Sequence, residues 1–480
     1  MTEINNNDDQ ENSPTPQQQA TYLLRKYKLV EGLVNLQDAP EDSLAESTVQ
    51  KQNLSELQAF LDQLHPADIA LILEALPLED RLLIWSMVKA DRDGEVLLET
   101  SDAVRATLIT DMHNQELVAA TEYLDADEIA DLAPDLPQEV MDDVFRSLPV
   151  EEREQLRAAM SYPEDSVGAL MDFDVITIRE DVRLEVVLRY LRMWDEMPDH
   201  TDQLFVVDRN EQLKGVLLIN RLLVSDPDTL VADVMTNEII KLQPDDVAQQ
   251  AANAFERYDL VSASVVDEND KLLGRVTVNT VIDFIRDKAE NEALNLAGLS
   301  EEEDLFAPVL KSVKNRWVWL AINLITAFIA SRVIGLFEDS IEKLVALAAL
   351  MPIIAGIGGN SGNQTITMIV RALALDQINT SSAWKLITKE VGVSIVNGLL
   401  WGTIVGLFTF AIYQNAELGL VMTLALVLNL LLAALLGVLI PLTLRKFGRD
   451  PAIGSSVMIT AVTDSGGFFI FLSLATIFLL

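Results

Sequence analysis

The residues best suited to chemistry lie in the last thirty positions, where one ionisable side chain interrupts an apolar stretch. This stretch, PAIGSSVMITAVTDSGGFFIFLSLATIFLL, runs from Pro451 to Leu480 and can span a bilayer, which takes about 20 residues. Asp464 falls within it, and Thr460 and Ser456 lie one and two helical turns earlier, on the same face. A carboxylate and two hydroxyls are oxygen ligands suited to a hard cation. The alternative is a carboxylate hydrogen-bonded inside a packed bundle, which serves structure alone.

A second unusual stretch, PIIAGIGGNSGNQT, covers residues 352–365. Its glycines and its proline hold a regular helix poorly, so we predict a broken backbone there. Irregular backbone at membrane depth is tolerated where it is buried in protein or lines a water-filled cavity. The predicted pore-lining residues of this stretch are Pro352, Gly358, Gly359, Asn360, Gly362 and Asn363. Close helix packing through small residues is the alternative, and the two can coexist.

Five apolar segments position these residues as membrane spans. They cover about residues 317–337, 344–370, 391–413, 418–444 and 451–480. Lysine and arginine gather before the first span, between the second and third, and between the fourth and fifth. Because basic loops stay on the cytoplasmic side, we expect a cytoplasmic amino terminus and an external carboxyl terminus. Arg332, inside the first span, is the exception.

Charge divides the chain into two parts. Residues 1–310 hold 66 acidic and 24 basic side chains, a net charge of −42, whereas residues 311–480 hold 8 and 11, a net of +3. The acidic part argues against nucleic acid as a partner, because nucleic-acid binding needs a basic face. The chain has no cysteine, which excludes disulfides and thiolate metal sites, and its three histidines are scattered.

The acidic part begins with a region, residues 1–52, in which we expect a disordered tail followed by a short helix and a polar linker. Residues 53–165 follow helical spacing throughout, with prolines between short segments and a phrase that recurs 60 positions later (Asp68-Ile-Ala and Glu128-Ile-Ala). We therefore predict an all-α acidic domain, a small helical superhelix.

Residues 166–284 contain a second repeat. The phrase VVD recurs at Val206 and Val265, with Gly215 and Gly274 at matching places, and each unit is typical of strand, helix, strand, turn, strand and helix. The repeat resembles a tandem CBS pair, an α/β regulatory module that often binds nucleotides or ions and often dimerises. We expect residues 285–316 to form a charged connecting helix, with an interruption near Gly298, that leads into a five-helix transmembrane domain of residues 317–480.

The whole order of parts, over roughly residues 53–480, resembles the MgtE family of magnesium channels. Specific phrases carry the resemblance: Tyr162-Pro-Glu-Asp with Gly168 and Met171, Gly358-Gly-Asn-Ser-Gly-Asn-Gln, Arg371-Ala-Leu and Thr463-Asp464. The family implies a homodimer in a bacterial inner membrane, with the ion path between the two membrane halves. It implies that Asp464 binds hydrated Mg²⁺ through its water shell, with Thr460 and Ser456 lining the pore.

The resemblance also implies regulation by Mg²⁺, which bridges carboxylates of the acidic domains and closes the channel. Asp259, Asp283 and Asp450 match the family's sensing carboxylates. The chain departs from the family pattern at Gln249, Asn279, Thr280, Lys288 and Asn291, where carboxylates are expected, and at Val457 and Ser465-Gly-Gly. We therefore expect the same pore with a rearranged sensor, for which Asp287, Glu290, Glu292 and residues 301–304 are candidate substitutes. ATP at the CBS pair is a second ligand that the resemblance leaves open.

Two other functions remain to be weighed. A transporter of Co²⁺, Mn²⁺ or Zn²⁺ would share the architecture, although the membrane part lacks the Cys and His that select softer metals. A membrane-anchored CBS nucleotide sensor would need neither Asp464 nor the glycine-rich span. We expect no enzyme activity, because the sequence holds no phosphate-binding loop, nucleophile elbow or His-metal motif.

Overall fold

The computed structural model describes residues 15–36, 43–194, 197–297, 299, 304–374, 378, 383–452 and 454–480. The chain divides into two compact units. Unit 1 comprises Met1–Arg286 and Asp304–Ala307, and unit 2 comprises Asp287–Glu303 and Pro308–Leu480.

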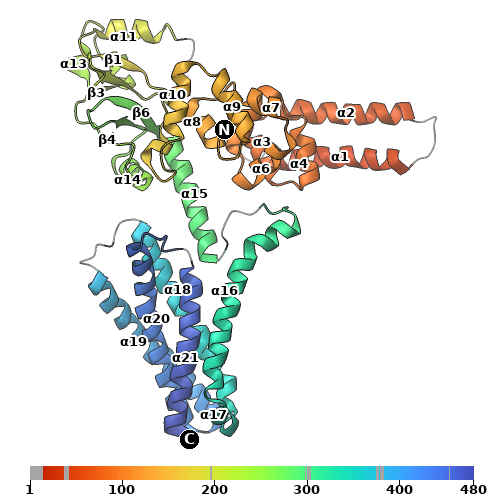
Figure 1. Ribbon diagram of the computed structural model, residues 1–480, viewed down its shortest axis with the longest axis vertical. Helices are drawn as coiled ribbons and strands as arrows, with labels where there is room; N and C mark the ends of the chain where they lie inside the picture. Colours follow the sequence, from red (N-terminus) through yellow and green to blue (C-terminus); the bar gives the residue numbers. More distant parts are fainter. Residues whose placement is uncertain are drawn as a thin grey trace, which may run out of the picture. The chain divides into compact units, whose positions relative to one another are not determined.

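The first half of unit 1 is helical (Figure 1). Its helices are α1 (Pro16–Leu36), α2 (Ser43–Leu61), α3 (Pro66–Glu74), α4 (Leu78–Trp85), the 3₁₀ turn η1 (Ala90–Arg92), α5 (Asp93–Glu99), α6 (Asp102–Asp111), α7 (Asn114–Ala120), α8 (Ala126–Leu132), α9 (Gln138–Ser147) and α10 (Val150–Ala159). Many of them begin at or just after a proline and carry acidic residues in the first turn. Both features are favourable at the N-terminus of a helix. One apolar core joins α1 to α10.

The amino-terminal prediction was wrong for the described residues. Residues 16–36 form one long helix, and α2 begins at Ser43, where a polar linker was expected. Ala20, Leu23 and Leu24 of α1 are buried in the same core as α2. The two helices run side by side in Figure 1, and Lys26 Nζ lies 2.7 Å from Glu56 Oε2. Burial of this apolar face explains a helix that polar composition obscured. The predicted tail of residues 1–14 and residues 37–42 lie outside the described residues.

The second half of unit 1 contains two three-stranded sheets of identical topology. The first has β1 (Thr177–Arg179), β2 (Gln203–Val207) and β3 (Leu213–Leu218), and the second has β4 (Lys241–Leu242), β5 (Ser262–Val266) and β6 (Leu272–Thr277). In each, the first pair is parallel, the second antiparallel, and the register shifts at the same place. Around them lie η2 (Val167–Leu170), α11 (Leu184–Leu191), α12 (Ile219–Val224), α13 (Val231–Val234) and α14 (Ala248–Tyr258).

Two glycines show that the repeats pack as a pseudo-symmetric pair. A Cβ at Gly215 would stand 2.7 Å from the carbonyl oxygen of Thr236, and one at Gly274 would stand 2.6 Å from that of Asp172. The first residues of each repeat therefore pack directly against the backbone of a glycine in the other repeat. A side chain at either glycine would prevent this close approach. This reciprocity is the arrangement predicted from the 59-residue offset.

The boundary between the two units falls within helix α15 (Val278–Ala297). The other helices of unit 2 are mostly long and apolar (Figure 1). They are α16 (Val309–Gly335), the short α17 (Glu338–Lys343), α18 (Ala346–Ala374), α19 (Ala383–Tyr413), α20 (Ala416–Lys446) and α21 (Ser455–Leu479). In the described part of the chain, four helices are long and apolar enough to cross a membrane: α16, α19, α20 and α21. The predicted class, a helical domain, a CBS pair and a helical membrane region, is confirmed, while the five-span count stays a prediction.

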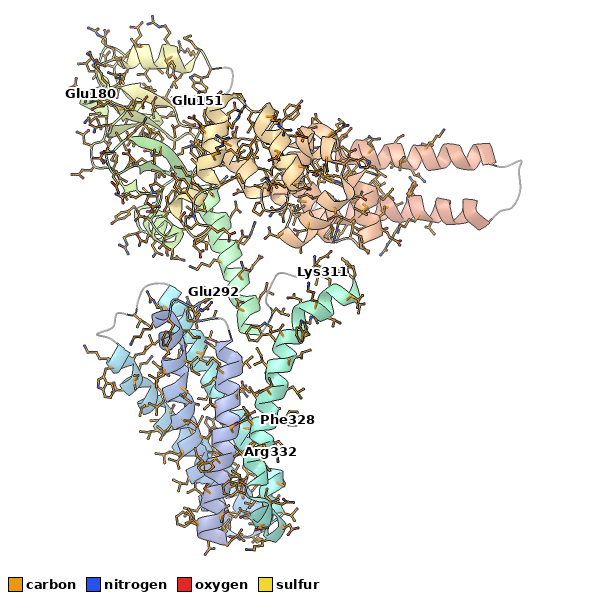
Figure 2. The ribbon with its side chains drawn as sticks, in the orientation of Figure 1. Glu151, Glu180, Glu292, Lys311, Phe328 and Arg332 are labelled. Atoms are coloured by element: carbon orange, nitrogen blue, oxygen red, sulfur yellow. The ribbon has the colours of Figure 1, made fainter. Side chains whose placement is uncertain are left out.

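Helix α20 forms the centre of unit 2. Half of the residues in its most apolar stretch are buried, against 6% of those in the corresponding stretch of α16. Its buried residues pack on α18 and α21. Figure 2 shows Phe328 and Arg332 projecting from α16, where both are exposed.

Candidate ion path and cation-sensing carboxylates

Helix α21 places the three predicted oxygen ligands in one row. Ser456, Thr460 and Asp464 follow each other at four-residue spacing along a continuous helix, and each is half-buried. The Thr460 hydroxyl donates to the Ser456 carbonyl oxygen at 2.8 Å, which leaves a hydroxyl lone pair available. The row is a line of oxygen-bearing side chains on a mostly apolar helix.

The adjacent face of α21 is buried and fixes this row. Ile459, Thr463 and Gly467 have little or no exposure. Thr463 donates to the Ile459 carbonyl oxygen at 2.8 Å, so its hydroxyl is satisfied within the helix. Asp464 directly follows a fully buried residue, and the packing of that residue therefore sets the direction of the carboxylate.

Helix α18 is continuous through the glycine-rich stretch, so the predicted broken backbone is wrong. The glycines instead admit neighbouring helices. A Cβ at Gly358 would stand 2.2 Å from Asn429 Nδ2, and one at Gly362 would stand 2.4 Å from Ile459 Cγ1. Packing offsets the conformational cost of glycine in a helix, which is the close-packing alternative that the sequence left open.

The predicted lining residues of α18 divide between two faces. Gly358, Gly359 and Gly362 are buried against α20 and α21, whereas Pro352 and Asn360 are exposed. Asn363 is half-buried, and its Oδ1 has no hydrogen-bond partner among the described residues. Asn360 therefore lies on an exposed face of α18, whereas the three glycines lie on the face that packs against α20 and α21.

Sequence reasoning missed a buried acid in unit 2. Glu390 of α19 is 3% exposed, and its Oε2 accepts a hydrogen bond of 3.4 Å from Thr365 of α18. Lys389 Nζ lies 3.5 Å from Oε1. The signal was present, because Glu390 begins the apolar run that follows Lys385 and Lys389.

The three predicted sensing carboxylates lie at different places. Asp259 is exposed and caps the end of α14 with a left-handed φ of 52°. Asp283 is exposed on α15, and its Oδ1 lies 3.5 Å from Arg286 Nη1. Asp450 is exposed before α21, where its Oδ1 accepts from the Ala452 backbone at 2.8 Å.

Helix α8 carries an acidic face that the sequence analysis passed over. Burial raises the pKa of Asp127 to about 8, with the nearby charge of Asp172 adding to the rise. Burial also raises the pKa of Asp125 to about 6, with Asp174 the next cause. The pKa of Asp131 is raised to about 6 by burial; Arg105 opposes the rise and the predicted sensor Asp283 adds to it.

This acidic face joins the two halves of unit 1, because Asp172 and Asp174 lie just before β1 while Asp127 lies on α8. Like charges that face each other across an interface repel, and a bound divalent cation removes that repulsion.

A second meeting of carboxylates occurs in unit 2. Burial raises the pKa of Glu292 on α15; Lys288 lowers it, and the charge of Asp450 raises it further. Glu292, proposed from the sequence as a substitute sensor, thus lies near the predicted Asp450. Asp304 is instead held by Arg81, and residues 301–303 lie outside the described residues. Within the described residues of one chain, no three His, Cys or acidic side chains converge as a metal site.

Comparison with known proteins gives matches along most of the chain. Family models match residues 351–474 (divalent cation transporter), 64–165 (MgtE intracellular N domain) and 231–287 (CBS domain). The magnesium transporter MgtE of Thermus thermophilus is 30% identical over 450 residues, covering 92% of this chain and 99% of that protein. The magnesium transporter MgtE of Bacillus subtilis is 27% identical over 426 residues, covering 89% and 94%.

Among solved structures, the cytosolic domain of the Mg²⁺ channel MgtE in complex with ATP is similar to part of the chain. It has 28% identity and a TM-score of 0.45, covering 50% of this chain and 98% of that one. The order of domains and the near full-length match to the Thermus protein lead to one conclusion: the chain belongs to the MgtE family of magnesium transporters.

Proposed function

We propose that this protein moves Mg²⁺ into the cytosol through a path between two copies of the chain, with Asp464 as the ion-binding group. The observation that carries the proposal is the row of Ser456, Thr460 and Asp464, half-buried on one face of α21. A second copy would bring two such rows together across a two-fold axis. Two carboxylates then face one hydrated ion, whose water shell is retained because Mg²⁺ dehydrates reluctantly.

The runner-up ions are Co²⁺, Mn²⁺ and Zn²⁺. The ligands on α21 are oxygen atoms only, and oxygen ligands favour harder cations such as Mg²⁺. The row therefore supports Mg²⁺ over the softer metals.

We further propose that cytosolic Mg²⁺ closes the path by binding between carboxylates of unit 1 and at the α15 end of unit 2. The α8 face, with Asp127 and Asp131 opposite Asp172 and Asp283, offers carboxylates that repel when ionised. Glu292 and Asp450 offer a second pair. Bound Mg²⁺ favours the compact arrangement, and its loss favours the arrangement in which the carboxylates separate.

The setting proposed is the inner membrane, with unit 1 in the cytoplasm and the carboxyl terminus outside, as the basic loops favour. ATP is a proposed ligand of the CBS pair, for which the tandem repeat is the support. The curated relatives are named as magnesium transporters, which supports a transporter rather than an enzyme as the function we propose.

The test compares Mg²⁺ uptake by cells that lack their own Mg²⁺ systems. They express either the natural chain or Asp464→Asn at equal membrane abundance. We expect the natural chain to restore growth at low Mg²⁺ and the variant to fail, because the amide removes the charge that attracts the ion. Equal rescue by both would remove Asp464 from the path. Rescue by neither, with uptake of Co²⁺ or Mn²⁺ by the natural chain, would favour the other cations.

A further inference from the structure

Asn429, on the central helix α20, is a fully buried polar side chain in unit 2, with no exposure. Its Nδ2 donates to the carbonyl oxygen of Ile354 on α18 at 3.0 Å. Its Oδ1 is buried and has no hydrogen-bond partner among the described residues. Burying an amide in an apolar interior is unfavourable unless its polar atoms are hydrogen-bonded. The half-satisfied amide of Asn429 therefore calls for a functional or structural explanation.

The amide fills the space left by two glycines on two other helices. A Cβ at Gly358 of α18 would stand 2.2 Å from Asn429 Nδ2. A Cβ at Gly467 of α21 would stand 2.7 Å from the same nitrogen and 3.1 Å from Oδ1. Three helices therefore meet at one side chain, and neither glycine can be replaced without moving it.

This joint lies one helical turn from Asp464. Gly467 follows Asp464 by three residues on α21, and Thr463, directly before Asp464, is also fully buried. A shift of α21 at the joint is carried to the carboxylate, because a helix moves as a rigid rod over one turn. The hydrogen bond from Asn429 to α18 fixes the other side of the same contact.

We propose that Asn429 is a positioning residue for transport: its amide sets the place of α21, and through it the place of the Asp464 carboxylate. The proposal rests on the function proposed above, in which Asp464 binds the ion. Two carboxylates that share one hydrated cation need matched positions, and a displacement of about 1 Å can cost a large factor in such a site.

The first test replaces the amide with an apolar side chain of similar volume, Asn429→Leu. Uptake is measured against Mg²⁺ concentration in vesicles containing a known amount of purified chain, so that half-saturation and maximal rate are separated. We expect the half-saturating Mg²⁺ concentration to rise about tenfold, as misplacement of a binding group would cause. A fall in maximal rate alone, with half-saturation unchanged, would mean a merely structural role and would overturn the proposal.

The second test is a double-variant cycle, which remains decisive even where Asn429→Leu reaches the membrane poorly. Gly358→Ala alone drives a methyl group into the amide and should raise half-saturation. Asn429→Ala removes the atoms it strikes, so adding Gly358→Ala to that background should change nothing further. Effects that are equal in both backgrounds would show that the two residues do not share a joint.

Two further variants separate the possible failures. Gly392→Ala makes the same change on α19, where a Cβ meets nothing within 4 Å, and should transport like the natural chain. Asp464→Asn reports on the function itself. If Asp464→Asn abolishes uptake while the Asn429 variants keep normal half-saturation, the positioning role fails and the pore assignment stands. If Asp464→Asn transports normally, the pore assignment fails first.

Discussion

Asp127 lies where an ionised carboxylate is disfavoured. It is half-buried on α8, lies near Asp172, and has its pKa raised to about 8 from an ordinary value of 3.8. Between about pH 4 and pH 8, the Asp127 carboxyl group therefore keeps its proton in the folded chain and loses it in the unfolded chain. The stability that this proton contributes is fully present below about pH 4 and is lost as the pH rises through about 8.

The pH dependence can be tested by replacing the carboxyl group with a neutral amide of the same shape, Asp127→Asn. With a chelator present, we expect the thermal midpoint of the natural chain to fall by about 2–4 °C between pH 6 and pH 8.5, and that of the variant to fall less. The matched control is Glu151→Gln, an exposed acid on α10. A natural chain and Asp127→Asn variant with parallel pH profiles would contradict the buried proton.

Among the contacts between elements, the pair Arg81 and Asp304 joins parts of unit 1 that are far apart in sequence. Arg81 of α4 is fully buried. Its Nη1 and Nη2 lie 2.6 Å and 3.0 Å from the two Asp304 oxygens, and its remaining donors meet Leu73, Leu76 and Thr107. Asp304 in turn accepts from the Phe306 backbone. The chain just before α16 is therefore fastened to the helical domain.

Breaking this pair should be costly. Arg81→Leu leaves a buried carboxylate without its counter-charge, for which the expected loss of stability is about 3–5 kcal/mol. We expect faster hydrogen exchange of residues 304–307 in the full chain and a lower thermal midpoint. Arg146→Leu is the control, because its pair with Asp143 is exposed and such pairs contribute about 0–1 kcal/mol. Unchanged exchange at residues 304–307 would refute the fastening.

At the level of helices and strands, the sequence predicted the features that follow from local spacing and from internal repeats. The helical spacing after residue 53 and the 59-residue offset of the sheets both carried over into the structure, because periodicity and local turns dictate them. The Arg81–Asp304 pair, separated by 223 residues, has no local signal. Gly358 shows the same limit: four nearby glycines suggested a broken helix, and only the position of Asn429 reveals why the helix holds.

At the scale of the whole molecule, acidity and apolarity are kept apart. The part up to residue 310 carries a net charge of −42 and the rest +3. Repulsion within the acidic part opposes its compact form, and divalent cations relieve repulsion locally at paired carboxylates. Monovalent salt screens the same charges over about 8–10 Å without bridging them. A sensor of Mg²⁺ must distinguish these two effects.

This distinction gives the last prediction, which concerns Mg²⁺ removal from the full chain. Because a ligand that binds only the compact state stabilises it by mass action, Mg²⁺ at about 100 times its Kd should contribute about 2.7 kcal/mol. We expect chelation to speed hydrogen exchange in α8 and in residues 172–174, and millimolar Mg²⁺ to reverse it. NaCl at equal ionic strength should reverse little, since screening does not bridge Asp127 to Asp172. If both salts slowed hydrogen exchange equally, the acidic face would contribute to solubility and not to Mg²⁺ sensing. Loss of the Mg²⁺ effect in Asp127→Asn, with Glu151→Gln unaffected, would place the sensing cation on α8.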